Sequence, residues 1–334
     1  GVICDRFLPI YCRSKLLMSP LEMPSAGWII LAVVQTLLML LLTPLVTGFS
    51  RVIRAKIHSR KGPGILQDYR DIMKLLRRQS VAPSNAGMIF WLMPWVLIIT
   101  MLLIAMALPT VTQTSPFPIS GDLITDIYLL AIFRFFFALA GIDSNSMFGG
   151  LGSSRELTLG ILVEPILILA ILLVALAMGT TDLGYISRAM ATQTWHQPLT
   201  LILAGIVCAF ALFIEMGKLP FDSAEAEQEL QEGPVTEYSG SNLALVKLGL
   251  GLKQLVVAQL FLAIFIPWGK ASSLTFTGLF SATVILLIKL FVIFLIAGIA
   301  ENTMARFRFM KIHRAIFPMF LVAVIALLFF ILGW

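Results

Sequence analysis

The stretch AGWIILAVVQTLLMLLLTPLVTGF, residues 26–49, holds 24 residues and no charged side chain. As a helix it would be about 36 Å long, at a rise of about 1.5 Å per residue. That length exceeds the hydrocarbon core of a bilayer, which is about 30 Å thick. The sequence therefore predicts that this segment crosses a membrane as an α-helix.

Seven further apolar runs of comparable length follow this one along the chain. Composition agrees with a membrane protein, since 59% hydrophobic residues, 13% charged residues and a mean hydropathy of +0.95 lie outside the range of soluble domains. We predict an all-α integral membrane protein in which a tail at 1–25 precedes a single membrane domain at 26–334. Its eight transmembrane helices are expected at residues 26–49, 88–109, 122–142, 157–179, 198–217, 248–268, 276–300 and 315–333.

The positions of Lys and Arg predict the orientation, because basic loops favour the cytoplasmic side of a membrane. If both termini face outward, the cytoplasmic loops hold 16 of the 24 basic residues. The net charge of +6 reflects this topology, so it gives no reason to invoke nucleic-acid binding. The predicted cytoplasmic loops are residues 50–87, 143–156 (read as a flexible Gly- and Ser-rich connection), 218–247 and 301–314.

The loop 218–247 contains the segment PFDSAEAEQELQEGPVTEY, residues 220–238, which we call the acidic segment. Asp222 followed by Glu225 is typical of a helix N-terminus and Gly233-Pro234 of a helix end, so a short helix of about 10 residues is expected. Acids in its last turn oppose the helix macrodipole, and local stability does not explain them. We therefore assign them to charge handling or to a cationic partner. The acids are Asp222, Glu225, Glu227, Glu229, Glu232 and Glu237.

Four charged residues interrupt the apolar runs, and a fifth lies one turn inside the end of its helix. A charged side chain at a helix centre costs about 2.5–3.5 kcal/mol on insertion scales, so such residues usually face a protein interior or a wet cavity. We predict a hydrated invagination on the cytoplasmic side that continues a proton relay from the acidic segment. The intramembrane groups are Arg134, Glu164, Lys253, Lys289 near the midplane, and Glu215.

A purely structural explanation stands beside this relay. Arg134 and Lys253 can snorkel to the cytoplasmic interface, and Glu164 can form a structural ion pair. Glu164 is too short to snorkel and Lys289 lies too deep to reach water easily, which favours a functional role for these two. For Arg134 both explanations stay open.

The first cytoplasmic loop contains RVIRAKIHSRKGPGILQDYRDIMKLLRRQ, residues 51–79. After the turn Gly62-Pro63-Gly64 an amphipathic helix is expected, with an apolar stripe at Tyr69, Ile72, Met73, Leu75 and Leu76. Its basic side indicates that the segment lies on anionic lipid or docks a soluble partner, whereas the simpler alternative is a basic loop that only sets topology. The docking candidates are Arg60, Arg70, Lys74, Arg77 and Arg78.

The cysteines and histidines do not form a recognisable cofactor site. Cys4 and Cys12 lie in the tail and Cys208 lies inside an apolar run, so a CxxC or four-cysteine set is missing. The three histidines are scattered over loops on both faces. We therefore expect no cofactor and no metal in this chain, and electron transfer must come from partner subunits.

Two motifs carry a resemblance to a known family. SRKGPGILQDYRDIMKLLRRQ (59–79) and IEMGKLPFDSAEAEQELQEGPVTEYSG (214–240) resemble the subunit 1 family of respiratory complex I. They are more similar to the family's relatives in group 4 membrane-bound NiFe hydrogenases of the hydrogenase-4 and formate hydrogenlyase type. The sequence GPGILQDYRDI, where complex I members usually have GPN and a longer Gly-rich continuation, favours the hydrogenase branch. The resemblance extends over roughly 26–334 through shorter matches at 134–143, 154–165 and 300–308.

The resemblance implies a non-catalytic, eight-helix subunit of an oxidoreductase complex in a bacterial cytoplasmic membrane, with periplasmic termini. The implied partners are the hydrogenase large and small subunits, an iron-sulfur subunit and antiporter-like membrane subunits. They would carry the NiFe centre and the 4Fe-4S clusters. By motif match, Glu164 and Glu215 correspond to the family's intramembrane acids. The acids matched to its coupling loop are Asp222, Glu225, Glu227, Glu229 and Glu232.

Two other functions remain open at this point. The runner-up is the quinone-site subunit of a complex I, that is, an NADH:quinone oxidoreductase. A stand-alone ion transporter is the third possibility, and it is disfavoured because the two halves of the chain show no internal repeat.

Overall fold

The computed structural model describes residues 26–116, 121–193, 197–224, 227–271 and 275–333. The tail 1–25 and Glu225 lie outside these described residues. The described part is almost entirely helical, and eight of its helices are long and apolar enough to cross a membrane, which confirms the predicted fold class. They are α2 (Ala26–Ile57), α4 (Met88–Ala107), α5 (Leu123–Asp143), α6 (Met147–Met178), α8 (Pro198–Glu215), α10 (Gly240–Phe265), α11 (Phe276–Thr303) and α12 (Ile312–Leu332).

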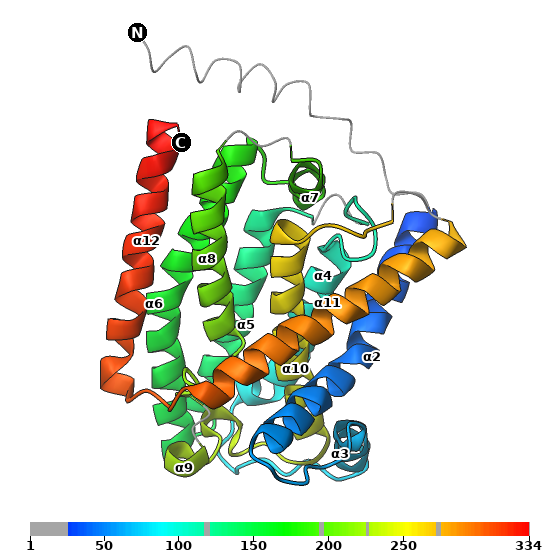
Figure 1. The fold of residues 1–334 in the computed structure, drawn as a ribbon. Coiled ribbons are helices and arrows are strands. Elements are labelled where there is room, and N and C mark those ends of the chain that lie inside the picture. The colour runs from blue at the N-terminus through cyan, green and yellow to red at the C-terminus, as the bar shows by residue number, and fades with distance from the viewer. Residues whose placement is uncertain (1–25, 117–120, 194–196, 225–226, 272–274, 334) are drawn as a thin grey trace.

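Three shorter helices mark the two ends of the bundle (Figure 1). The amphipathic helix predicted after Gly62-Pro63-Gly64 forms as α3 (Gln67–Leu76), and it lies with α9 (Glu227–Leu230) at the lower end in Figure 1. At the opposite, upper end lies α7 (Leu183–Ala191), whose N-cap Asp182 accepts hydrogen bonds from Gly184 N at 2.7 Å and Tyr185 N at 3.4 Å.

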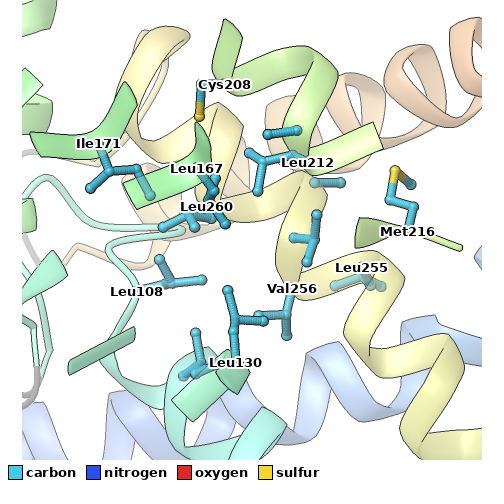
Figure 2. Close-up of a cluster of buried hydrophobic side chains, with 14 of the residues drawn as sticks. Leu108, Leu130, Leu167, Ile171, Cys208, Leu212, Met216, Leu255, Val256 and Leu260 are labelled. Carbon is cyan, nitrogen blue, oxygen red and sulfur yellow. The ribbon is translucent and has the colours of Figure 1, made fainter. Parts of the chain in front are cut away.

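Helix α10 occupies the centre of the bundle, where it packs against α2, α4, α8 and α11. Its backbone approaches α2 closely, since a Cβ on Gly251 would lie 2.8 Å from Thr43 Cγ2. Figure 2 shows the apolar core around it, where Leu255, Val256 and Leu260 of α10 meet side chains of α6 and α8. Most of α10 is therefore shielded from lipid, and Lys253 in the middle of this helix is buried in protein.

Helix α11 crosses the bundle at a strong tilt (Figure 1). It packs mainly on α2, whereas the following helix α12 packs on α6 and α8. A large apolar groove of about 680 Å³ lies among α8, α10, α11 and the start of α12. The tilt matters for the site because it sets where the charged residues of α11 meet the rest of the protein.

Two local predictions were wrong. Residues 147–156 are not a flexible connection but the first three turns of α6. Their glycines permit close packing, since a Cβ on Gly152 would lie 2.6 Å from Pro234 Cδ and 2.8 Å from Gly233 Cα.

The expected helix of about 10 residues in the acidic segment is also much shorter, because α9 spans only Glu227–Leu230. Gln231 and Glu232 have φ angles of 49° and 69°, in the left-handed region, which ends the helix there. Asp222 pairs with Arg306.

Candidate functional site

Arg134 of α5 stands at the centre of a buried charged network. Its side chain is 7% exposed, and it donates to three carboxylates on two other helices. The guanidinium meets Glu156 Oε1 at 3.2 Å, Glu164 Oε1 at 2.7 Å and, most closely, Glu215 Oε1. The Arg134 side chain therefore does not extend to the membrane interface. It lies inside the protein with three acidic partners.

Lys253 of α10 extends this network to a fourth helix. Its ammonium lies 3.2 Å from Glu215 Oε2 and 5.2 Å from the centre of the Phe133 ring. Glu215 thus accepts from one cation on each of its carboxylate oxygens. Three carboxylates share two cations in the network, so it has room for one additional proton without gaining net positive charge.

A glycine on α6 lets the Arg134 side chain reach its partners. A Cβ on Gly160 would lie 2.7 Å from Arg134 Cδ and 3.0 Å from Arg134 Nη1. Glu156 and Glu164 lie one turn before and one turn after Gly160, so both carboxylates flank the arginine that crosses between them. The four-residue spacing of Glu156, Gly160 and Glu164 thus places both acids and the glycine on the side of α6 that faces Arg134 of α5.

The charged network borders one cavity, and a second, larger cavity shares lining residues with the first. The inner cavity, of about 60 Å³, is lined by Arg134, Glu156, Glu215 and Lys253 among others. A larger cavity of about 510 Å³ lies among α2, α3 and α10. Both cavities are lined by Asp222, Leu250 and Gln254, so these residues lie between the larger cavity and the one that borders the network.

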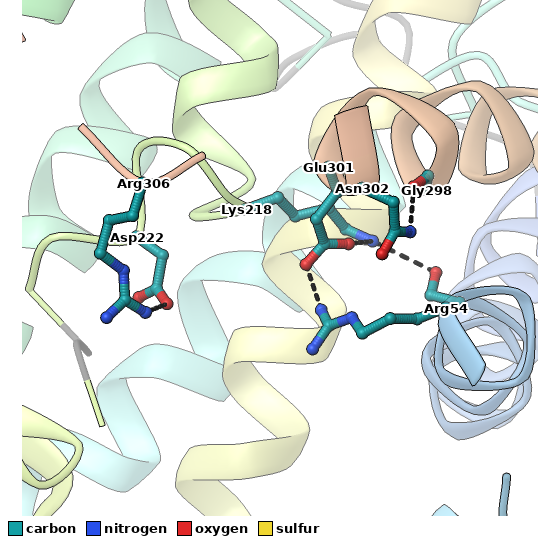
Figure 3. Close-up of polar contacts among 8 residues, drawn as sticks. Arg54, Lys218, Asp222, Gly298, Glu301, Asn302 and Arg306 are labelled. Atoms are coloured by element: carbon teal, nitrogen blue, oxygen red, sulfur yellow. Dashed lines mark hydrogen bonds and ion pairs between the residues drawn. The ribbon is translucent and has the colours of Figure 1, made fainter. Parts of the chain in front are cut away.

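The acidic segment lies at the lower end, beside these cavities. Asp222 pairs with Arg306 at 2.9 Å (Figure 3) and Glu229 pairs with Arg155 at 2.6 Å. Glu232 lines the larger cavity. Glu225 lies outside the described residues, and of Glu227 only the backbone is described, within α9.

A second ionic cluster, which the sequence reasoning did not single out, lies beside the first. Arg54 of α2 and Lys218 converge on the buried Glu301 of α11, Lys218 Nζ at 3.8 Å from Oε2 (Figure 3). Lys218 also contacts Ser50 Oγ at 3.2 Å and lies over the Phe294 ring. Burial lowers the pKa of Lys218, an effect that Glu301 opposes and Arg54 reinforces.

Other groups missed from the sequence are Glu156 and Asp126. Glu156 was assigned to a loop, although its spacing from Glu164 would have placed both on one helix face. Asp126 interrupts an apolar run near the upper end of α5, and both of its carboxylate oxygens are buried without a hydrogen-bond partner in the described structure. Its position within a predicted transmembrane run was the available signal.

Lys289 does not join the network at the lower end. Its ammonium donates to the carbonyl of Ile266 at 2.8 Å and to that of Trp268, both just beyond the upper end of α10. The packing of α11 brings the middle of that helix to the connection that follows α10, which hydropathy alone does not reveal. Lys289 thus lies apart from the other predicted members of the proton path.

The basic side of α3 faces outward. Asp68 anchors the helix through Thr47 Oγ1 at 2.7 Å and Arg51 Nη1 at 2.7 Å. Met73 and Leu76 of the predicted apolar stripe are 55% and 48% exposed, so the stripe is only partly covered. The five docking candidates are all exposed: Arg60, Arg70, Lys74, Arg77 and Arg78.

Known proteins share this chain's sequence over most of its length. The model of the family described as NADH dehydrogenase matches residues 29–332. Hydrogenase-4 component C of Escherichia coli (strain K12) is 58% identical over 91% of this chain and 96% of its own length. Formate hydrogenlyase subunit 4 of the same strain is 52% identical over 82% and 90%.

More distant relatives share the same architecture. A subunit of the NADH-quinone oxidoreductase of Rickettsia bellii (strain RML369-C) is 31% identical over 69% of this chain and 70% of its own length. Among solved structures, a chain of the membrane-bound sulfane sulfur reductase, an archaeal respiratory membrane complex, superposes with a TM-score of 0.78. That match covers 90% of this chain and 98% of the other at 24% identity, and it supports the fold.

Proposed function

Because the chain belongs to the NADH dehydrogenase family, we propose that it is the membrane anchor and coupling subunit of a hydrogenase complex. The complex is of the group 4 NiFe type, as in hydrogenase-4 and formate hydrogenlyase. The chain docks the peripheral redox subunits and provides a charged path for proton translocation. Identities of 58% and 52% to hydrogenase-4 and formate hydrogenlyase subunits, against 31% to an NADH-quinone oxidoreductase subunit, support this branch.

One observation carries the coupling role. A network of three carboxylates and two cations is buried among α5, α6, α8 and α10, next to the acidic segment. Two cavities that share lining residues connect Asp222 of that segment to the network. A redox event in a docked subunit would change the charge beside the acidic segment. That change would alter the electric field at the buried network, because charges inside a protein are poorly screened.

We propose the following assembly around the chain. The hydrogenase large and small subunits and an iron-sulfur subunit, which hold the NiFe centre and the 4Fe-4S clusters, cover the lower end. Antiporter-like membrane subunits pack on the lipid-facing sides. The lower end is cytoplasmic and the complex lies in a bacterial inner membrane, in accord with the basic residues at that end.

The alternative is the quinone-site subunit of a complex I. The 510 Å³ cavity among α2, α3 and α10 has the size of a small-molecule site, which is the observation that favours it. Its lining mixes charged residues such as Arg51, Asp71 and Glu232 with apolar ones, whereas an isoprenoid chain favours an apolar wall.

Purification of the native complex separates these alternatives. We expect nickel together with iron in the purified assembly, and hydrogen-linked electron transfer to an artificial acceptor. A complex without nickel that reduces quinone with NADH would establish the alternative. A chain that purifies alone and transports ions would contradict both.

The docking role predicts the result of a charge reversal on α3. The double variant Arg77→Glu and Arg78→Glu should weaken retention of the peripheral subunits by roughly tenfold or more, because a partner surface that complements the basic side of α3 would then meet like charges. Co-purification with a tagged form of this chain, measured at low and high salt, tests it. The control is Lys311→Glu with Arg314→Glu, an equal charge change at exposed positions of the same end. Full co-purification of the α3 variant would contradict docking by this helix.

A further inference from the structure

The upper end of the bundle contains a second polar site, remote from the acidic segment. A small cavity there, of about 10 Å³, is lined by Thr110, Gln259, Lys270 and Lys289 among apolar residues. That volume gives room for the centre of a water molecule. Lysines, a hydroxyl and an amide around so small a space are unusual in a membrane-embedded bundle, where polar groups are costly.

Two of these groups point to a bound ligand. Thr110 and Gln259 are 4% and 2% exposed, yet Thr110 Oγ1 and Gln259 Oε1 have no hydrogen-bond partner in the described structure. A buried polar atom without a partner costs about 1–3 kcal/mol. One water molecule in the cavity, donating to Gln259 Oε1 and bonding to Thr110 Oγ1, would remove this cost at both positions.

Lys270 is the group through which the site can exchange protons. Its ammonium donates to Ser187 Oγ of α7 at 2.5 Å and to the Ala263 carbonyl at 3.3 Å, and the side chain is partly exposed. Burial, reinforced by the charge of Lys289, lowers the pKa of Lys270 to about 7. The backbone next to it is held firmly, since Ala271 N donates to the Val111 carbonyl at 2.9 Å.

We propose that Lys270, with Lys289, Thr110 and Gln259, forms a water-binding proton-exchange site at the upper end of the bundle. In the exchange step the partly exposed Lys270 ammonium releases a proton to solvent water at the upper end and becomes a neutral amine. A proton carried through the cavity water then binds the amine and restores the ammonium, and the cavity water is left unchanged. The proposal rests on the proposed coupling function and supplies it with a site on the opposite face. Between Lys253 and Gln259, helix α10 carries the apolar residues Leu255, Val256, Val257 and Ala258. The upper site and the charged network around Arg134 are therefore separate sites that would serve separate steps of proton movement.

A structural role for the two lysines must be distinguished from this one. Lys289 and Lys270 both donate to carbonyls at the upper end of α10, and cations there stabilise a helix C-terminus. Arginine preserves such a role because it keeps the positive charge and the donors. It cannot release a proton at physiological pH.

The variant Lys270→Arg therefore tests the proposal in the full complex, reconstituted in vesicles. We expect assembly and electron transfer at the wild-type level and at least a tenfold loss of proton translocation, read from a pH-sensitive dye. Lys311→Arg, the same exchange at an exposed lower-end position, should leave both activities unchanged. Translocation by Lys270→Arg at the wild-type rate would overturn the proposal.

A second variant keeps the test decisive if Lys270→Arg fails to assemble. Thr110→Val removes one hydroxyl at nearly constant volume, and a several-fold loss of translocation is expected because the water loses a partner; an unchanged rate would refute the site. Failure of the proposed coupling function would give a different result. In that case vesicles with the wild-type complex would already transfer electrons without moving protons.

Discussion

Replacing Glu215 with Gln is expected to abolish proton translocation by the assembled complex, with a loss of about 10²-fold or more, while electron transfer continues. Gln keeps the shape of the side chain and still accepts from Arg134, but an amide at this position cannot take up and release a proton as a carboxylate can. Proton uptake by inverted membrane vesicles, measured beside hydrogen-dependent dye reduction, separates the two activities.

The matched control for this variant is Glu237→Gln. Glu237 lies in the acidic segment, outside the buried network, and is partly exposed, so the same chemical change should be silent there. Glu164→Gln removes a more exposed member of the network and should cause a smaller loss, because the side chain of Glu164 is 38% exposed and water can replace it. Normal translocation by both Glu215→Gln and Glu164→Gln would reject the relay.

Replacing Arg134 with Met is expected to prevent stable assembly. The change leaves Glu156, Glu164 and Glu215 with Lys253 as the remaining cation of the network. Removal of one partner from a buried ion pair costs about 3–5 kcal/mol, a large share of the stability of a typical domain. The yield of the complex from membranes and its thermal midpoint in detergent measure the effect.

A double variant identifies the cause of that loss. Arg134→Met combined with Glu156→Gln removes a carboxylate that pairs with Arg134 and not with Lys253, so the double variant should be more stable than Arg134→Met alone. Arg134→Lys should give an intermediate result, because an ammonium cannot serve three carboxylates with the planar geometry of a guanidinium. Wild-type stability of Arg134→Met would show that the network is dispensable for folding.

Hydropathy was sufficient to predict the eight spanning helices, because crossing a bilayer demands long apolar runs whatever the tertiary packing. The same reasoning found Arg134, Glu164 and Lys253, since a charge inside such a run needs a partner. It missed Glu301 and Lys218, because charges at helix ends are common and carry no signal of their own. Their burial comes from contacts among α2, α11 and the connection after α8, which are far apart in sequence.

The partners of a charged residue were predicted less well than its membership of a helix. Lys289 lies midway along α11, and its ammonium meets the carbonyls that follow α10, a contact between helices that hydropathy does not reveal. The Gly- and Ser-rich stretch before Glu156 was assigned wrongly for a related reason. Its composition is typical of a loop in isolation, but the close approach of Gly233 and Pro234 requires small residues on a helix.

The contact between Gly152 and Pro234 has a mechanical consequence. A Cβ on Gly152 would overlap the Gly233-Pro234 backbone and ring, so at this contact α6 meets backbone and ring atoms of the acidic segment, which have little freedom to move aside. Any shift of that segment by a docked neighbour is therefore transmitted as a rigid push on α6. Because Glu156 lies one turn further along this helix, the push changes its distance from Arg134 directly.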